Sequence, residues 1–207
     1  MVNQEQVLEI LHAVGEKITE EKLFLTELDN IIGDGDHGVN LARGFAEIEK
    51  KRPMMKGKDI GTMFKTAGMA LVSTVGGASG PLYGTAFMQA GKALAGKTEL
   101  NAQDLVTILD AFVAGVQLRG KSVAGEKTML DAMIPARDAI KAALDAGKSA
   151  KDALADGVAA AEQGVEYTKT IIATKGRASY LGERSLGHQD PGATSFTTML
   201  KVVAERV

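Results

Sequence analysis

The spacing of its apolar residues constrains this chain more than any other feature. Along almost all of the 207 residues, apolar side chains recur every three or four positions, and the alternation typical of a half-buried strand is almost absent. Ala, Leu, Met, Glu and Lys, which favour helices, are plentiful. The pattern predicts an all-α fold, with apolar stripes at residues 7–18, 41–48, 60–71, 87–94, 105–116, 129–144, 154–172 and from 193 to the C-terminus.

Two of these stripes follow recognisable helix starts. Asn101 with Asp104 resembles a capping box, and Ser149 with Asp152 forms a second cap. Pro135 lies inside the sixth stripe and is expected to kink its helix, because proline removes a helix hydrogen bond. We therefore expect eight helices in one domain of residues 1–207, a length that suits a single core.

Charge and composition exclude several classes of function. The chain has 24 basic and 26 acidic side chains, a formal charge of −2, so bulk electrostatics favours neither nucleic acid nor an anionic membrane. There is no cysteine, which excludes disulfides and thiolate metal sites. The N-terminus has no signal-peptide pattern, and no window approaches the roughly 20 apolar residues of a membrane span. We expect a soluble, cytoplasmic protein that recognises its partners locally.

The breaks between the stripes are longer than a bundle requires. Four of them are glycine-rich: residues 29–38, 76–84, 117–126 and 176–192. Glycine loses more backbone entropy on folding than other residues, so its concentration in loops indicates tight turns or a ligand that approaches bare backbone.

The first break, within LDNIIGDGDHGVN (28–40), places three carboxylates and an imidazole close together: Asp29, Asp34, Asp36 and His37. Carboxylates held within about 4–6 Å repel one another, and a divalent cation removes that penalty. Oxygen ligands favour Mg²⁺, Ca²⁺ or Mn²⁺ over zinc or copper. The alternative is that the aspartates are caps and turn formers and that His37 is an ordinary loop residue.

A calcium-binding EF-hand does not fit this loop. Counted from Asp34, the glycine stands fifth instead of sixth, and Phe45 occupies the twelfth position, where a bidentate glutamate is needed. Mg²⁺ takes few carboxylates and completes its shell with water and substrate phosphate. The acidic loop therefore predicts a phosphate ligand.

Two further loops could serve that ligand. In GGASGPLYG (76–84), backbone amides, Ser79 and a helix start with Pro81 could face an anion, although a plain interhelical turn would look the same. Residues 176–192 hold Arg177 and Asp190 together with Arg184 and His188, and a structureless loop of this length is usually functional or mobile. We interpret it as a lid or docking surface.

Charge balance favours two metal ions. With the three aspartates and ADP, two Mg²⁺ would leave a net charge of about −2 for helix dipoles and Arg177 to offset, whereas one ion would leave about −4.

Four segments together resemble the L subunit, or L domain, of dihydroxyacetone kinase. They are LDNIIGDGDHGVNLARGF (28–45), GGASGPLYGTAF (76–87), GEKTMLDAMIPA (125–136) and GRASYLGERSLGHQDPGATS (176–195). They span almost the whole chain in the order of the family. The resemblance implies an antiparallel barrel of eight amphipathic helices with a nucleotide site at one rim.

The resemblance also implies roles for individual residues. Asp29, Asp34 and Asp36 would hold two Mg²⁺ against the phosphates, and Arg177 would be catalytic. The residues implied in nucleotide binding are His37, Gly38, Asn40, Ala78, Ser79, Gly120, Thr128, Met129, Arg177, Asp190, Pro191 and Gly192.

In that family, the γ-phosphoryl group passes from ATP to dihydroxyacetone held on a K subunit. The chain length fits a free-standing L subunit, whose retained ADP is rephosphorylated by an M subunit of the phosphotransferase system. Alternatives are an L subunit that uses exchangeable ATP, a nucleotide-dependent binder of a transcriptional regulator, and the nucleotide domain of a fatty-acid kinase. A homodimer is a further expected assembly.

Overall fold

The computed structural model describes all residues, 1–207, and the fold is almost entirely α-helical, as predicted. It contains nine α-helices, one 3₁₀-helix and two short strands. In chain order they are β1 (Val2–Asn3), α1 (Gln4–Glu20), α2 (Lys22–Ile32), α3 (His37–Met55), α4 (Ile60–Thr74), α5 (Ser79–Ala93), β2 (Glu99–Leu100), α6 (Ala102–Gly120), α7 (Leu130–Asp145), α8 (Ala150–Lys169), η1 (Arg177–Ser185) and α9 (Pro191–Arg206).

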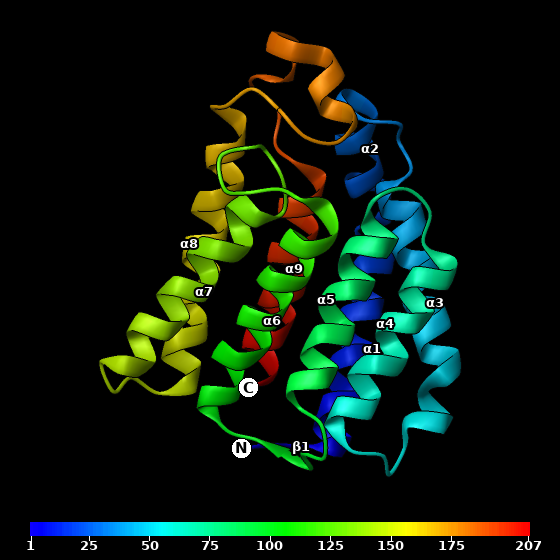
Figure 1. Ribbon diagram of the computed structural model, residues 1–207, viewed down its shortest axis with the longest axis vertical. Coiled ribbons are helices and arrows are strands. Elements are labelled where there is room, and N and C mark those ends of the chain that lie inside the picture. The colour runs from blue at the N-terminus through cyan, green and yellow to red at the C-terminus, as the bar shows by residue number, and fades with distance from the viewer.

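Eight of the helices form a closed ring. Each of α1, α3, α4, α5, α6, α7, α8 and α9 packs against the next, and α9 returns to α1. Successive helices of the ring run in opposite directions (Figure 1). This is the antiparallel barrel that the family resemblance implied.

The ninth helix, α2, lies outside the predicted count. It is only 11 residues long, and three of its residues are buried: Leu25, Asp29 and Ile32. It sits at one rim, against α3 and η1 (Figure 1). Sequence periodicity missed it because so short a stripe, ending in an acidic loop, resembles a connection. The break predicted at 29–38 is correspondingly shorter, and η1 occupies much of the break at 176–192.

The barrel encloses a continuous apolar core. A cluster of 46 buried residues runs through the eight ring helices. The rings of Phe64, Phe87 and Phe112 contact one another in tilted pairs across three neighbouring helices, with centroid separations of 5.5 Å and 4.9 Å. Contacts of this kind fix the relative positions of the helices, and so of the loops at their ends.

The predicted helix starts are confirmed. Asn101 and Asp104 form a capping box at α6, and the Ser149 side chain accepts a hydrogen bond from the Asp152 N–H at α8. Pro135 lies inside α7, which continues from Leu130 to Asp145.

The two ends of the barrel differ. At one end β1 pairs with β2, with Val2 opposite Leu100, and the helix connections are short. At the other end lie the α2–α3, α4–α5, α6–α7 and α8–α9 connections, around which the four glycine-rich segments fall (Figure 1). Two of the predicted breaks are shorter than expected, because α5 already begins at Ser79 and α6 continues to Gly120. The ring therefore brings them together at one rim. No helix is long and apolar enough to cross a membrane.

Candidate functional site

The acidic loop is held in place by its own first carboxylate. Asp29 lies in the last turn of α2, and its Oδ2 accepts hydrogen bonds from the backbone N–H groups of Asp36 (2.9 Å) and His37 (3.1 Å). Asp29 thereby satisfies donors at the start of α3, where the helix dipole favours negative charge. A Cβ at Gly33 would lie 2.0 Å from Asp29 Oδ1, so a larger residue there would displace the Asp29 carboxylate.

The three predicted metal ligands meet in one cluster. One carboxylate oxygen from each of Asp29, Asp34 and Asp36 lies within 4.8 Å of the others. Asp29 is buried, Asp36 is half-buried and Asp34 is exposed. Asp34 also forms an ion pair of 2.9 Å with Arg177 at the start of η1. Oxygen donors at this separation suit a hard divalent cation that keeps open positions for water or phosphate.

The glycine-rich loop between α4 and α5 faces this cluster. Gly77 has a φ of +65°, a conformation that favours glycine, and a Cβ there would contact Asp36. Helix α5 begins at Ser79, with Pro81 in its first turn, as expected. The free N–H groups of this helix start therefore lie beside the carboxylates and can donate to an anion.

His37 connects three helices at the base of the cluster. Its Nδ1 is 2.8 Å from Ser79 Oγ of α5, and its Nε2 is 2.9 Å from Ser195 Oγ of α9. Ser195 Oγ is in turn 2.8 Å from the hydroxyl of the buried Tyr83. Burial lowers the pKa of His37 to about 4, against the opposing effect of Asp29. A neutral imidazole with both nitrogens bonded orients its neighbours and has no free position for a proton from a substrate.

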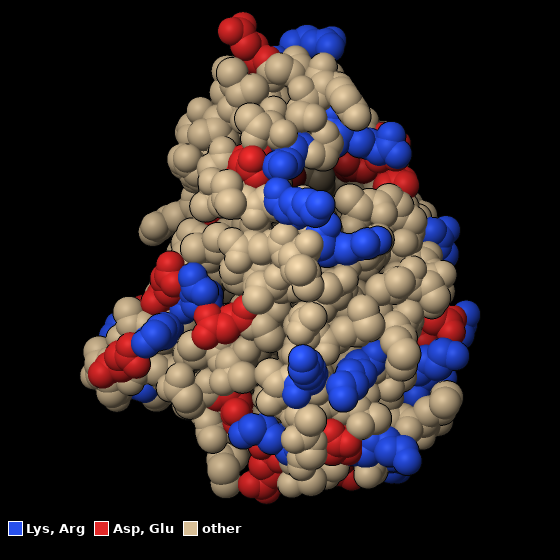
Figure 2. Space-filling view, viewed as in Figure 1, with Lys and Arg blue, Asp and Glu red and all other residues tan.

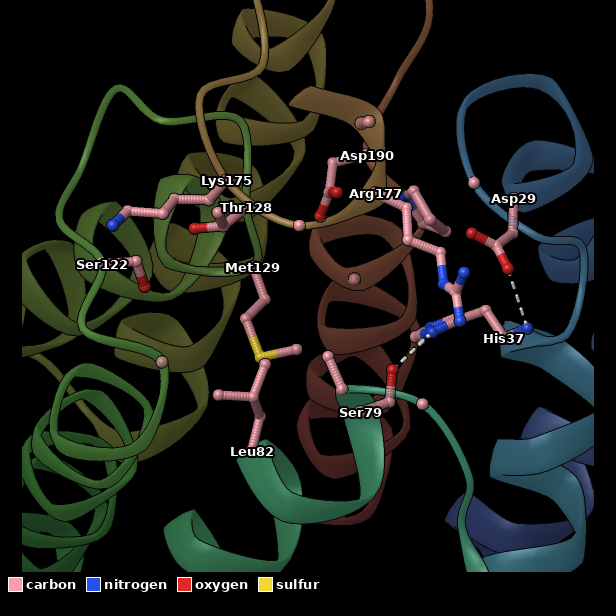
Figure 3. A pocket seen from close by; sticks show the side chains of 18 of the residues that line it. Asp29, His37, Ser79, Leu82, Ser122, Thr128, Met129, Lys175, Arg177 and Asp190 are labelled. Atoms are coloured by element: carbon pink, nitrogen blue, oxygen red, sulfur yellow. Dashed lines mark hydrogen bonds between the residues drawn. The ribbon is translucent and has the colours of Figure 1, made fainter. Parts of the chain in front are cut away.

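The opposite wall is built by the α6–α7 connection. Asp131 of α7 accepts hydrogen bonds from the N–H groups of Gly125 (2.5 Å) and Thr128 (2.8 Å), which folds the connection over the helix start. Met129 then lies above Leu82 of α5 (Figure 3). This wall is more apolar than the acidic one, with Leu82 and Met129 in its lining, and apolar side chains of this kind suit an aromatic base.

The segment before α9 closes the site between these walls. Asp190 caps α9 by accepting a hydrogen bond from the Ala193 N–H (2.7 Å), and Pro191 is the first helical residue. Burial raises the pKa of Asp190 to about 7. The carboxylates of Asp131 and Asp29 raise this pKa further, whereas the hydrogen bond from Ala193 and the cation of Lys127 lower it. Figure 3 shows Arg177 between Asp190 and His37, reaching toward the carboxylate wall.

These walls surround an open cavity of about 490 Å³. Its lining includes every residue predicted for the site except Gly38 and Asn40. Gly38 abuts α2, where a Cβ would lie 2.0 Å from the Lys22 carbonyl oxygen. The Asn40 side chain accepts a hydrogen bond from Arg43 (2.6 Å) and lies behind Gly76. In this structure both residues shape the loops around the cavity from outside it.

Sequence reasoning missed three basic residues in the lining: Arg119, Lys127 and Lys175. Figure 2 shows basic side chains gathered over the upper part of the molecule, beside acidic ones. Lys127 lies in the GEKTML segment and Lys175 directly precedes Gly176, so each stood next to a recognised motif. Their neighbours across the cavity are distant in sequence, and only the fold reveals those contacts.

The cavity thus joins a carboxylate cluster, a row of backbone donors, an arginine and an apolar wall. This arrangement can hold a cation, an anion attached to it and a flat apolar group at the far end. It contains no activated nucleophile, so the chemistry that it supports is the positioning and charge neutralisation of a bound phosphate compound.

Comparison with known proteins agrees with this geometry. The family model of the DAK2 domain matches residues 31–205. The PEP-dependent dihydroxyacetone kinase 1, ADP-binding subunit DhaL, of Listeria innocua is 47% identical over 98% of this chain and 96% of its own length. The PEP-dependent dihydroxyacetone kinase, ADP-binding subunit DhaL, of Escherichia coli is 42% identical over 98% of this chain and 97% of its own.

A solved structure extends the comparison to the fold. The dihydroxyacetone kinase from C. freundii in complex with AMP-PNP and Mg²⁺ matches with a TM-score of 0.74 and 27% identity. The match covers 96% of this chain and 33% of the kinase chain, so the present chain corresponds to about a third of that protein. With a family match over most of its length and two full-length relatives, the chain belongs to the DAK2 domain family, as the sequence resemblance indicated.

Proposed function

We propose that residues 1–207 act as one nucleotide-binding unit, the ADP-binding subunit of a phosphoenolpyruvate-dependent dihydroxyacetone kinase. The subunit holds a magnesium nucleotide, receives a phosphoryl group from an M subunit and passes it to dihydroxyacetone on a K subunit. One observation carries the proposal: three carboxylates within 4.8 Å of one another face a glycine-rich helix start inside one cavity. The names of the full-length relatives support the choice of kinase.

The donor set fits magnesium. Asp29, Asp34 and Asp36 supply oxygen atoms only, and no cysteine competes for a softer metal. Two Mg²⁺ balance the carboxylates and a nucleoside diphosphate better than one does, as the charges indicate. When bound, the ions neutralise and orient the phosphate oxygens for in-line transfer.

The remaining walls bind the rest of the nucleotide. Ala78 and Ser79 offer backbone and hydroxyl donors to the phosphates at the start of α5. Gly120, Thr128 and Met129 contact the base and ribose, and the 190–192 segment closes over them. An apolar wall with few polar groups is the usual setting for such a ligand.

Arg177 changes partner during the reaction. In the structure it pairs with Asp34. If Asp34 holds a cation, the Arg177 guanidinium would be released to face the transferred phosphoryl group, where charge develops. Any general base belongs to the partner subunit, because both His37 nitrogens are already bonded.

The decisive experiment measures what the protein retains. It is purified in Mg²⁺, dialysed extensively and denatured, and released nucleotide and metal are quantified, with the Asp36→Asn variant treated in parallel. About one ADP and two Mg²⁺ per wild-type chain, and none in the variant, is the expected result. An empty wild type that binds added Mg-ATP would indicate exchangeable nucleotide, and one that binds no magnesium nucleotide would exclude the kinase role.

The 3₁₀-helix supports a second role for the same subunit. In η1, Tyr180 is 87% exposed, more than any other large apolar side chain except that of Met1. The surface of η1 contains both Tyr180 and Arg177, so its conformation would depend on the bound nucleotide. We propose that a regulatory protein, or a second copy of the chain, binds this surface. Binding that differs between the ADP and ATP forms, and that Tyr180→Ser removes, is the test.

A further inference from the structure

Lys127 is a buried cation with no carboxylate bound to it. Its side chain is 1% exposed. The ammonium group donates to three backbone carbonyl oxygens: Thr168 and His188 at short range, and Ile171 at 3.5 Å. A lysine is almost never this buried unless it is paired, so this arrangement requires an explanation.

The three carbonyls come from the segment that leads toward α9. Thr168 lies in the last turn of α8, where carbonyls lack helix partners and a cation is favoured. Ile171 follows that helix, and His188 stands two residues before the cap of α9. Lys127 itself belongs to the α6–α7 connection, so one ammonium group joins two of the four connections that form the cavity.

Neighbouring contacts reinforce this junction. The Thr168 hydroxyl accepts a hydrogen bond from the Asp190 N–H (2.9 Å), and the Thr174 N–H donates to the Glu126 carbonyl (3.3 Å). Lys127 also has a φ of +61°, a conformation that L-residues rarely adopt. Its backbone turns here while its side chain crosses to the other segment.

We propose that Lys127 is a positioning residue for the nucleotide: it ties the α6–α7 connection to the segment before α9, which fixes the spacing between Thr128–Met129 and Asp190–Gly192. The inference rests on the proposed function. It assigns Lys127 to the nucleoside end of the cavity, away from the carboxylates. Burial lowers its pKa, with Asp190 and Asp131 acting in the opposite direction.

The test compares two ligands by calorimetry, Mg-ADP and Mg-pyrophosphate. Pyrophosphate reaches only the carboxylates and the α5 start, whereas ADP also needs the far wall. Lys127→Met is expected to weaken ADP binding at least tenfold and pyrophosphate binding less than threefold. Lys121→Met is the control, because Lys121 is exposed in the same connection and shares a positive φ of 50°.

A second variant guards against misfolding of the first. Thr168→Val removes the hydroxyl that receives the Asp190 N–H and leaves the three carbonyls in place, so it should show the same selective loss. Unchanged ADP affinity in both variants, or equal losses for ADP and pyrophosphate, would overturn the inference. Failure of the wild type to bind Mg-ADP would instead remove the proposed function.

Discussion

At the scale of single residues, the aspartates of the cluster differ in burial and in hydrogen-bond partners. Asp29 is buried and accepts two backbone N–H groups, whereas Asp34 is exposed and pairs with an arginine. Asp29 therefore shapes the loop through its own hydrogen bonds, whereas Asp34 is held only by an exposed ion pair. On the proposed function, the pair between Asp34 and Arg177 is the part of the cluster that changes when a cation binds.

This contrast predicts a specific effect of Arg177→Met. Loss of the guanidinium should lower the turnover of phosphoryl transfer by about 10²–10³-fold, as removal of other transition-state donors does, while Mg-ADP affinity stays within about threefold because Asp34 no longer has a competitor. Steady-state kinetics and calorimetry on the same preparation measure both quantities. Arg184→Met, in the same 3₁₀-helix, is the control, and equal losses of turnover and affinity would contradict a transition-state role.

Asp190 predicts a pH dependence of stability in the metal-free protein. Its pKa is about 7 when folded and close to 3.8 when unfolded, so between these values the unfolded chain has lost a proton that the folded chain keeps. Stability contributed by this group therefore falls as the pH rises from about 4 to about 7.

Asp190→Asn should remove that dependence, since asparagine also caps helices well. The variant is expected to match the wild type at pH 4 and to exceed it at pH 8 by more than about 1 kcal/mol, given about 1.4 kcal/mol per pKa unit. Urea unfolding in EDTA at the two pH values measures the difference. A variant that is less stable at pH 8 would show that the carboxylate is ionised when folded.

Much of the site at this scale could be read from the sequence. The density of charge in residues 29–38 predicted the carboxylate cluster, because turns alone do not need three aspartates. The links from His37 to Ser195, and from Lys127 to His188, span 158 and 61 positions. No local pattern encodes such pairs, since they depend on how the ring closes.

At the scale of elements, the α4–α5 pair carries the glycine-rich loop that faces the carboxylate cluster. Its contact is unusually close because glycines face one another across it. A Cβ at Gly68 would lie 2.6 Å from the Gly84 carbonyl oxygen, and one at Gly61 would lie 2.6 Å from that of Gly91. In each helix the two glycines of this contact are seven residues apart, which is about two helical turns and keeps them on the same face.

Gly68→Ala should therefore destabilise the fold, by about 1–3 kcal/mol as for other overpacked cores. The obstructing atoms include backbone, which cannot rotate away. Gly15→Ala in α1 is the control: its nearest contact is Phe45 Cβ at 3.3 Å, and alanine gains about 1 kcal/mol in helix propensity. Urea unfolding measures the stability of both variants, from midpoints compared at the same dependence of the unfolding free energy on urea concentration. A Gly68→Ala variant as stable as the Gly15→Ala variant would refute the close-packing account.

Apolar periodicity predicted the ring helices but not α2 or η1. Both are short, and both lie at the rim that carries the site. The apolar face of α2 is narrow, with Leu25 and Ile32 one full heptad apart. Elements of this kind are stabilised by contacts with the rest of the fold, so their own residues give a weak signal.

At the scale of the whole molecule, the antiparallel ring places the α2–α3, α4–α5, α6–α7 and α8–α9 connections at one rim (Figure 1). The segments that line the cavity therefore come from every part of the chain, from α2 to the start of α9. A ligand that contacts all of them binds only when the ring is closed, so its binding free energy adds to the stability of the entire fold.

This coupling predicts a ligand-dependent thermal stability. With Mg-ADP at 100 times its dissociation constant, the free energy of unfolding should rise by about 2.7 kcal/mol. ADP with EDTA should give almost none of this stabilisation, because the phosphates would then face unscreened carboxylates.

Asp36→Asn should lose the stabilisation by Mg-ADP, while its unliganded melting midpoint stays close to that of the wild type, since the Asp36 side chain does not cap α3. Calorimetric melting measures these effects for the wild type and for Asp36→Asn, each without ligand and with Mg-ADP, and for the wild type with ADP and EDTA. Equal stabilisation by ADP with and without Mg²⁺ would mean that the nucleotide binds without the carboxylate cluster, and the metal site would then have to be abandoned.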